Sequence, residues 1–433
     1  MNMRKQTWRA AVSAAAIAAS AAIPMAANAA THELYATNTV GGVTVTPASD
    51  VKWFFAIDGD KAYLGANDGS VPNGSWEANT ALGLDSPTKV TIPRSVTVDG
   101  VTYQITEISN RAFYQDTTIE SVVALDNINT VGWRSFHGTP VQNVLFKGPN
   151  TAADGSQPMA SLYANVSGTW RVFEQAKSLK LVIIGPGLKS GYAADRMRMP
   201  NAQNASILVP DFQISGNWNA LNDSTVGGTN NRVVRYGPNS DFDMAMGDTT
   251  MTFYPKNVNG LTNVLSWAST IKSAFDMDTK IVITNRIEVS DGVNIIDSML
   301  QNVMMEAPLR FLAFTPTTAN ALMDVLAWAP SFMTRFGLDT RISVTNTLDL
   351  TGVTIDPTAV SGVTFDRLVF SAKTQTQLDA ILGAFPATTP ISIDPTGLTE
   401  NMTIPDDYPN VFVKTVPGVT VKRTASGFML IVK

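Results

Sequence analysis

The chain has 433 residues, no cysteine, two histidines and a formal net charge of -5. The lack of cysteine excludes a thiol nucleophile, an iron–sulfur cluster and cysteine zinc sites, and two histidines leave little room for histidine-based chemistry. The acidic balance argues against nucleic acid or an anionic membrane surface as the main partner, because both reward clustered Lys and Arg. We therefore expect no catalytic residues, no metal and no cofactor.

The N-terminus has the pattern of a secretory signal peptide. A cationic stretch at residues 4–9 precedes an apolar run at residues 10–23, and Ala-Asn-Ala at 27–29 matches the small-x-small pattern of a cleavage site. The apolar run is too short to cross a bilayer, which needs about 20 residues. We expect cleavage after Ala29 and a mature chain that is extracellular or at the cell surface, with the periplasm as the alternative. No stable membrane insertion is expected after cleavage.

Residues 30–88 are predicted to form a small N-terminal β cap. Residues 43–45, 51–57 and 62–64 have the β-branched and aromatic character of strands. Asp-Gly-Asp at 58–60 separates the last two and predicts a hairpin turn. The remaining mature chain is too long for one compact core, which favours further domains or an elongated array.

A repeated unit begins within residues 89–221. Phe113 and Phe136 lie 23 residues apart in similar segments, and Phe173 ends a third copy after a 14-residue extension. Each Phe is followed by an apolar pair, Ile119/Val122, Val141/Val144 and Leu179/Val182. One such unit cannot bury its apolar side alone, so we expect the three rings to stack in a continuous core.

These residues carry a resemblance to a known family. Val90–Pro93, Val98–Tyr103 and Ile105–Phe113 together resemble the segment that opens the repeats of BspA-type leucine-rich-repeat surface proteins, and Ser206–Pro210 resembles a closing repeat. The chain departs from the family where a Cys or Asn often follows the Phe by three residues, since Asp116, Thr139 and Ala176 occupy that position. The resemblance, which covers roughly residues 85–220, implies a surface protein with an irregular leucine-rich-repeat ladder.

Residues 222–248 are rich in turn formers and are predicted to be a linker. A second repeat follows in residues 249–433, where Asp278–Asn285 returns as Asp339–Asn346 with a shift of 61, and a shorter third copy follows. Leu261, Val264, Leu265 and Ala268 have the spacing of one helix face, and strands are expected to begin near 251, 280, 309, 341, 368 and 391. Closing strands are expected at the C-terminal end.

The predicted fold class is a β-rich α/β solenoid made of irregular leucine-rich repeats with one short strand per turn and a small N-terminal β cap. The second repeat segment either stacks on the first or is hinged to it through the linker. Both arrangements are open.

Four features suggest chemistry, and each has a plainer interpretation. Asp58/Asp60 and Asp241/Asp243/Asp248 lack the full pattern of a calcium loop and are expected to be turn residues. Gly185–Gly187 is expected to be a turn at a repeat end, and His137 a turn residue without a partner. The Met-rich segment Ile295–Met305 is expected to be a helix packed in the core.

The preferred function is binding or adhesion to a protein or glycan. Trp133 and Trp170 share one repeat position, and Arg134 and Arg171 follow them, so the four side chains are the candidate ligand ridge. The plainer interpretation is that each Trp covers the edge of its own repeat. Two other functions stay open: a polysaccharide-active enzyme on a β-solenoid scaffold, which needs charged side chains converging on one strand face, and a purely structural envelope component.

Overall fold

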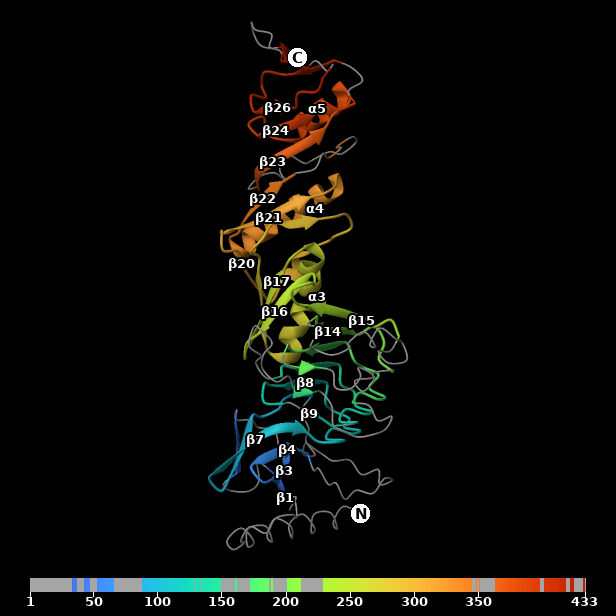
Figure 1. Cartoon of the computed structure of the whole chain (residues 1–433), viewed down its shortest axis with the longest axis vertical. Coiled ribbons are helices and arrows are strands. Elements are labelled where there is room, and N and C mark those ends of the chain that lie inside the picture. Colours follow the sequence, from blue (N-terminus) through green and yellow to red (C-terminus); the bar gives the residue numbers. More distant parts are fainter. Residues whose placement is uncertain are drawn as a thin grey trace. The chain divides into compact units, whose positions relative to one another are not determined.

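The computed structural model divides into two units, Met1–Asn239 and Ser240–Lys433 (Figure 1). The structure describes residues 33–36, 43–46, 53–65, 88–128, 130–132, 134–148, 160–161, 172–186, 188–189, 201–211, 229–344, 348, 350, 363–397, 401–417, 421–423 and 431–432. The predicted signal peptide lies outside these residues. Several parallel sheets and few helices make up the described chain, as expected of a β-rich repeat fold.

The N-terminal sheet has the strand order β1-β3-β4-β7-β6-β2, with β9 beside β7. Its strands are β1 (Glu33–Ala36), β2 (Val43–Thr46), β3 (Phe54–Asp58), β4 (Lys61–Leu64), β6 (Ser95–Val98), β7 (Val101–Ile108) and β9 (Thr130–Val131). The predicted hairpin is confirmed: β3 and β4 are antiparallel, and Gly59 supplies the left-handed backbone of the turn with φ +62°. The predicted boundary at residue 88 is not a boundary of this sheet, because β4 pairs with β7.

The second sheet of the first unit is parallel throughout and has the order β15-β14-β12-β10-β8-β5. Its strands are β5 (Lys89–Thr91), β8 (Ser121–Ala124), β10 (Asn143–Phe146), β12 (Leu181–Ile184), β14 (Ser206–Pro210) and β15 (Arg232–Tyr236), and a small parallel pair joins β11 (Ala160–Ser161) to β13 (Leu188–Lys189). The segment Ser206–Pro210 does not close the sheet, since β15 extends it by one more strand.

The expected phenylalanine stack is confirmed. Phe113, Phe136 and Phe173 are at most 2 % exposed. The ring centroids of Phe113 and Phe136 are 5.0 Å apart, and those of Phe136 and Phe173 are 5.4 Å apart, with nearly parallel planes. Backbone hydrogen bonds hold the register, because the amides of Phe113 and Phe136 donate to carbonyl oxygens of the following repeat. The apolar pairs that follow each Phe are buried in the same core cluster.

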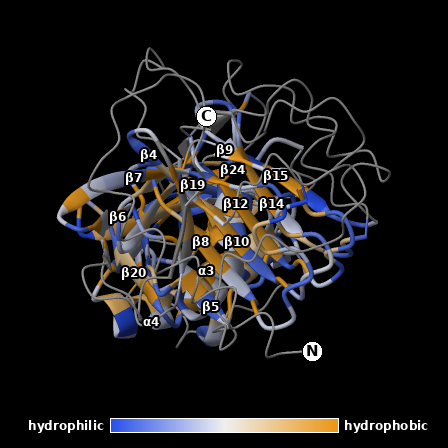
Figure 2. Ribbon diagram, turned by 90° about the horizontal axis from the view of Figure 1, so that it is seen from below, coloured by the Kyte–Doolittle hydropathy of each residue, from blue (hydrophilic) through white to orange (hydrophobic). Residues whose placement is uncertain are grey.

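The parallel sheet of the first unit is buried on both faces. Its inner face joins the phenylalanine core, whereas a second apolar row occupies the outer face in register: Val123, Leu145, Ile183, Leu208 and Val234. None of these five side chains is more than 9 % exposed. Figure 2 shows β8, β10, β12 and β14 mainly in the hydrophobic colour. Continuous apolar runs such as Leu181–Ile184 are typical of strands covered on both sides.

The second unit contains a four-stranded sheet, order β16-β17-β18-β20, a six-stranded sheet, order β19-β21-β22-β23-β24-β26, and a C-terminal sheet, order β25-β27-β28. The strands are β16 (Phe242–Met246), β17 (Thr250–Pro255), β18 (Asp278–Val282), β19 (Ile287–Val289), β20 (Val303–Glu306), β21 (Phe311–Pro316), β22 (Asp339–Ser343), β23 (Val363–Ser371), β24 (Ile391–Asp394), β25 (Met402–Ile404), β26 (Val411–Val413), β27 (Val421–Arg423) and β28 (Ile431–Val432). All six expected strand starts correspond to observed strands.

The helices α3 (Val258–Phe275), α4 (Ala319–Phe336) and α5 (Gln375–Ala384) follow β17, β21 and β23. The residues that cap α3 and α4 are also repeated with the shift of 61 residues. Asn257 and Thr318 cap the N-termini through side-chain oxygens, and Asp276 and Gly337 end the helices in the left-handed conformation. The predicted helix face is confirmed, because all four of its residues are buried in α3.

One prediction for the second half is wrong. Residues 295–305 form a 3₁₀ turn, η4 (Asp297–Leu300), followed by β20, and not a helix. The alternating burial of Val303–Glu306 explains the strand, since a period of two fits a half-buried sheet. The range predicted to be a linker contains the boundary between the units but also β15 and β16, which bury Tyr236 and Phe242 completely.

Candidate binding surfaces

The predicted ligand ridge is described only at Arg134, because Trp133, Trp170 and Arg171 lie outside the described residues. Arg134 has a left-handed backbone, φ +53°, and a side chain that is 13 % exposed. Its Nε donates a hydrogen bond to Oε2 of Glu174 at 3.0 Å. The side chain therefore braces its own repeat against the next one, and contact with a ligand stays a prediction.

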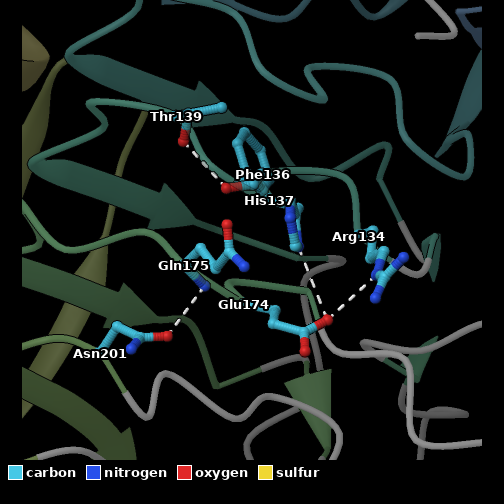
Figure 3. A network of polar contacts seen from close by, with 7 residues as sticks. All are labelled: Arg134, Phe136, His137, Thr139, Glu174, Gln175 and Asn201. Atoms are coloured by element: carbon cyan, nitrogen blue, oxygen red, sulfur yellow. Dashed lines mark hydrogen bonds and ion pairs between the residues drawn. The ribbon is translucent and has the colours of Figure 1, made fainter. Parts of the chain in front are cut away.

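A polar stack runs beside the phenylalanine core, one residue after each Phe, and Figure 3 shows its members His137 and Glu174. The rings of Tyr114 and His137 are stacked with centroids 4.9 Å apart, and His137 Nδ1 lies 3.5 Å from Oε2 of Glu174. Arg111 lies over the outer part of this stack, with its guanidinium carbon 5.7 Å from the Tyr114 ring centroid. The stack joins three successive repeats.

The surroundings of His137 favour the neutral imidazole. Burial lowers the pKa of His137, the positive charge of Arg134 lowers it further, and the carboxylate of Glu174 opposes both effects. His137 lies in a turn, as expected, but the expectation that it has no partner is wrong. Aligning the residues after each Phe, Tyr114, His137 and Glu174, was the available signal, because side chains at one repeat position stack.

Two further contacts complete this network (Figure 3). Oδ1 of Asn201 accepts a hydrogen bond from the Gln175 amide at 3.1 Å, and Oγ1 of Thr139 donates to the Phe136 carbonyl at 2.9 Å. These side chains satisfy backbone groups where the chain turns. The network is a brace between repeats.

The other suspected chemical features have structural roles. The Gly185 amide donates to the Phe146 carbonyl at 2.7 Å, and a Cβ at Gly185 would lie 1.8 Å from the Lys147 carbonyl oxygen, so this glycine allows a close approach of two repeats. Asp243 lies in β16 and not in a turn. Among the described residues, no three His, Cys, Asp or Glu side chains converge in a way that could hold a metal ion.

The four-stranded sheet of the second unit has an open outer face. Thr252, Lys280 and Met304 are opposite one another on neighbouring strands, and Tyr254 is opposite Asp243. Met304 is 46 % exposed and Tyr254 is 36 % exposed. Nζ of Lys280 lies 2.8 Å from Oε1 of Glu306. Aromatic, thioether and charged groups therefore share one accessible surface.

The six-stranded sheet has a second accessible group on its outer face, which we name the Arg341 cluster: Arg286, Phe311, Arg341 and Asp366. The guanidinium carbon of Arg341 is 4.0 Å from the Phe311 ring centroid. Oδ2 of Asp366 accepts a hydrogen bond from Nη2 of Arg286 at 2.7 Å, and its Oδ1 lies 3.9 Å from Nη1 of Arg341. Neither this cluster nor Tyr254 was predicted, because register between distant strands is not visible in one sequence.

A bulge in β23 orients Asp366. The pairing of β22 with β23 runs from Ile342 opposite Phe365 directly to Ser343 opposite Arg367, so Asp366 is the extra residue. After the bulge, β23 pairs with β24. Bulges re-aim a side chain and interrupt pairing, and here the re-aimed group is the carboxylate of the Arg341 cluster.

No helix in the described part of the chain is long and apolar enough to span a membrane.

Comparison with known proteins gives no family model and no curated protein that matches the chain. Two solved structures are similar to it at low identity. A leucine rich cell surface protein from Faecalibacterium prausnitzii A2-165 is 12 % identical, with 94 % of this chain and 97 % of that chain covered and a TM-score of 0.21. The pneumococcal vaccine antigen PcpA is 11 % identical, with 87 % of this chain and 100 % of that chain covered and a TM-score of 0.23.

Proposed function

We propose that this protein is an exported, surface-associated binding protein of the leucine-rich-repeat type, with one strand per solenoid turn, and that it engages a macromolecular partner without catalysing a reaction. The proposed partner is a protein or a glycan. The signal-peptide pattern and the stacked repeats support export and the repeat fold, respectively. The open strand faces of the second unit support binding.

The observation that carries this proposal is the outward face of the second unit's sheets. Tyr254 and Met304 lie on the four-stranded sheet, and Phe412, which is 62 % exposed, lies opposite Ser392 on the six-stranded sheet. These large apolar side chains face water on open sheet faces, where a partner can reach them. Aromatic residues and methionine are enriched at the centres of protein interfaces.

The experiment is to probe a glycan array and a protein array with the mature chain, residues 30–433. The test variant carries Tyr254→Ser and Met304→Ser, and the control carries Val101→Ser, a change at a residue that is 53 % exposed in the first unit. We expect the wild type and the control to bind the same ligand and the double variant to lose it, while thermal melting stays unchanged.

A second measurement addresses catalysis. A panel of polysaccharides is incubated with the mature chain, and new reducing ends or unsaturated products are quantified. We expect no release above the control without protein. Steady release, or an array on which nothing binds, would contradict the proposed function.

A further inference from the structure

We propose that the Arg341 cluster is the specificity site of the second unit and that it binds a carboxylate on an acidic, leucine-containing segment of a protein partner. This inference rests on the proposed binding function of the second unit. It adds the residues, the chemistry of the ligand and the class of partner.

Arg341 is held in place but keeps its hydrogen-bonding capacity. Its guanidinium lies over Phe311 at 4.0 Å, while its ion-pair contact with Asp366, at 3.9 Å, is too long for a hydrogen bond. Within the described part of the chain, none of its N–H groups donates a hydrogen bond, and the side chain is 42 % exposed. A guanidinium offers five donors in a planar fork that matches a carboxylate. Stacking fixes that fork in advance, which lowers the entropy cost of binding.

Asp366 supports Arg341 without neutralising it. The nearer partner of Asp366 is Arg286, whose Nη2 donates at 2.7 Å, whereas Arg341 is 3.9 Å away. Arg286 also donates to the Phe314 carbonyl through Nη1, so it is fixed at both ends of its guanidinium. The carboxylate is therefore paired with Arg286, and the positive charge of Arg341 remains available for a ligand.

The charges on these strands favour an anion. The outer part of β19 and β21–β23 and the adjoining segments contain Arg286, Arg310, Arg341 and Arg367 against Glu288, Asp339 and Asp366. Four cations minus three anions leave +1, in a chain whose net charge is -5. A locally basic surface attracts acidic partners.

The neighbours of Arg341 leave space for a ligand and indicate a protein. Ala313 and Thr364 lie opposite Arg341 on the two flanking strands, and both are small. Leu309, two residues before Phe311, is 67 % exposed and can contact an apolar side chain. Since Arg341 covers one face of the Phe311 ring, that face cannot pack against a sugar. An acidic residue next to leucine in a peptide chain fits these features better than a uronic acid.

The test selects a random-peptide phage library on the mature chain and measures the affinity of the selected peptides by fluorescence anisotropy at low and high salt. We expect peptides rich in Asp, Glu and Leu, with affinity that falls as salt rises.

Arg341→Gln should weaken binding by at least about tenfold, because one partner of a charged hydrogen-bonded pair is lost. Arg341→Lys should also weaken it, since an ammonium does not reproduce the planar fork. Asp339→Asn should strengthen peptide binding, because it removes a negative charge that repels an acidic ligand. Asp339 lies opposite Phe311 on the neighbouring strand.

The matched control is Arg335→Gln, the same change in charge at an exposed position in the last turn of α4. The proposal is overturned if Arg341→Gln and Arg335→Gln bind the peptides equally. It is also overturned if the selected peptides lack acidic residues, or if polygalacturonate and not the peptides loses binding in Arg341→Gln. In all three cases the proposed binding function still stands, because it fails only when the arrays show no ligand for the mature chain or when the mature chain steadily releases products from a polysaccharide.

Discussion

The parallel sheets of the two units differ in what their outer faces contain. In the first unit, the outer row from Val123 to Val234 is apolar and buried. In the second unit, the corresponding rows contain Lys280, Met304 and Arg341, which are partly or largely exposed. The strands that contain these rows pair in parallel in both units, so their outward residues, and not the pairing, distinguish a structural layer from an accessible surface.

The difference is visible in the strand sequences. Leu181–Ile184 is apolar at every position, whereas Val303–Glu306 alternates between buried and exposed residues. A sheet covered on both sides needs the first pattern, and a sheet with one open face needs the second. Four predictions test this contrast.

The largest effect is expected at the centre of the phenylalanine stack. Phe136 is fully buried between Phe113 and Phe173, so Phe136→Ala should lower the free energy of unfolding of the first unit by about 3–5 kcal/mol. Phe412→Ala, at an exposed position of the second unit, should change stability by less than about 0.5 kcal/mol. Denaturant melts of the mature chain measure both. A loss below about 1 kcal/mol for Phe136→Ala would mean that the stack is not a close-packed core.

The next prediction compares the outer faces by the same chemical change. Val123 is 6 % exposed on β8, and Val282 is only partly buried on β18. Val→Thr keeps the shape but adds a hydroxyl group, so Val123→Thr should cost about 1–2 kcal/mol, because burying a hydroxyl is unfavourable. Val282→Thr should stay within about 0.5 kcal/mol. Equal losses in denaturant melts would show that the two faces do not differ in burial.

A smaller effect of opposite sign is expected inside the second unit. Thr279 and Thr340, which are 61 residues apart, are at most 1 % exposed, and their Oγ1 atoms have no hydrogen-bond partner. In the third copy of this repeat, the strand β24 begins with a buried apolar residue, Ile391, in place of a threonine. Because an unsatisfied buried hydroxyl is unfavourable, Thr279→Val and Thr340→Val should each raise the free energy of unfolding by about 1 kcal/mol. Lower melting temperatures in both variants would contradict this.

The smallest effect concerns acid. The folded pKa of His137 is lowered, first by burial and then by Arg134, with Arg111 acting in the same direction and Glu174 opposing. The unfolded chain therefore binds a proton at higher pH than the folded chain. The free energy of unfolding of the first unit should fall as the pH drops through the unfolded value of about 6.5 towards the lowered folded pKa.

The variant His137→Gln should weaken that pH dependence while leaving the acid response of the second unit unchanged. Denaturant melts at neutral and mildly acidic pH provide the comparison. If wild type and variant lose equal stability on acidification, the imidazole does not change its protonation on unfolding in this range.

Local patterns in the sequence predicted much of the fold. The spacing of Phe113, Phe136 and Phe173 predicted the core, and the 61-residue shift predicted where α3 and α4 pack, because burial and helical periodicity are encoded within short segments. The Met-rich segment was misassigned because Met is a strong helix former, whereas the alternating burial over Val303–Glu306 is that of a strand. The extent of the N-terminal sheet was missed because β4 pairs with a strand about 40 residues away.

The candidate site was predicted less well than the fold. Arg134 was chosen from its repeat position, yet that position could not reveal Glu174 as its partner, which lies 40 residues further along the chain. The Arg341 cluster joins residues from positions 286, 311, 341 and 366. It depends on a bulge in β23, and a bulge shifts register in a way that composition does not encode.

The spacing of the phenylalanine rings has a consequence for how this chain can evolve. Phe113 and Phe136 are 23 residues apart and Phe136 and Phe173 are 37 residues apart, yet the two ring separations differ by only 0.4 Å, from 5.0 to 5.4 Å. The distance between neighbouring strands sets the ring spacing, and the length of the connection does not. Lengthening a connection costs little entropy once the loop is already long. A repeat can therefore gain or lose residues between one Phe and the next while the rings of the core keep their spacing.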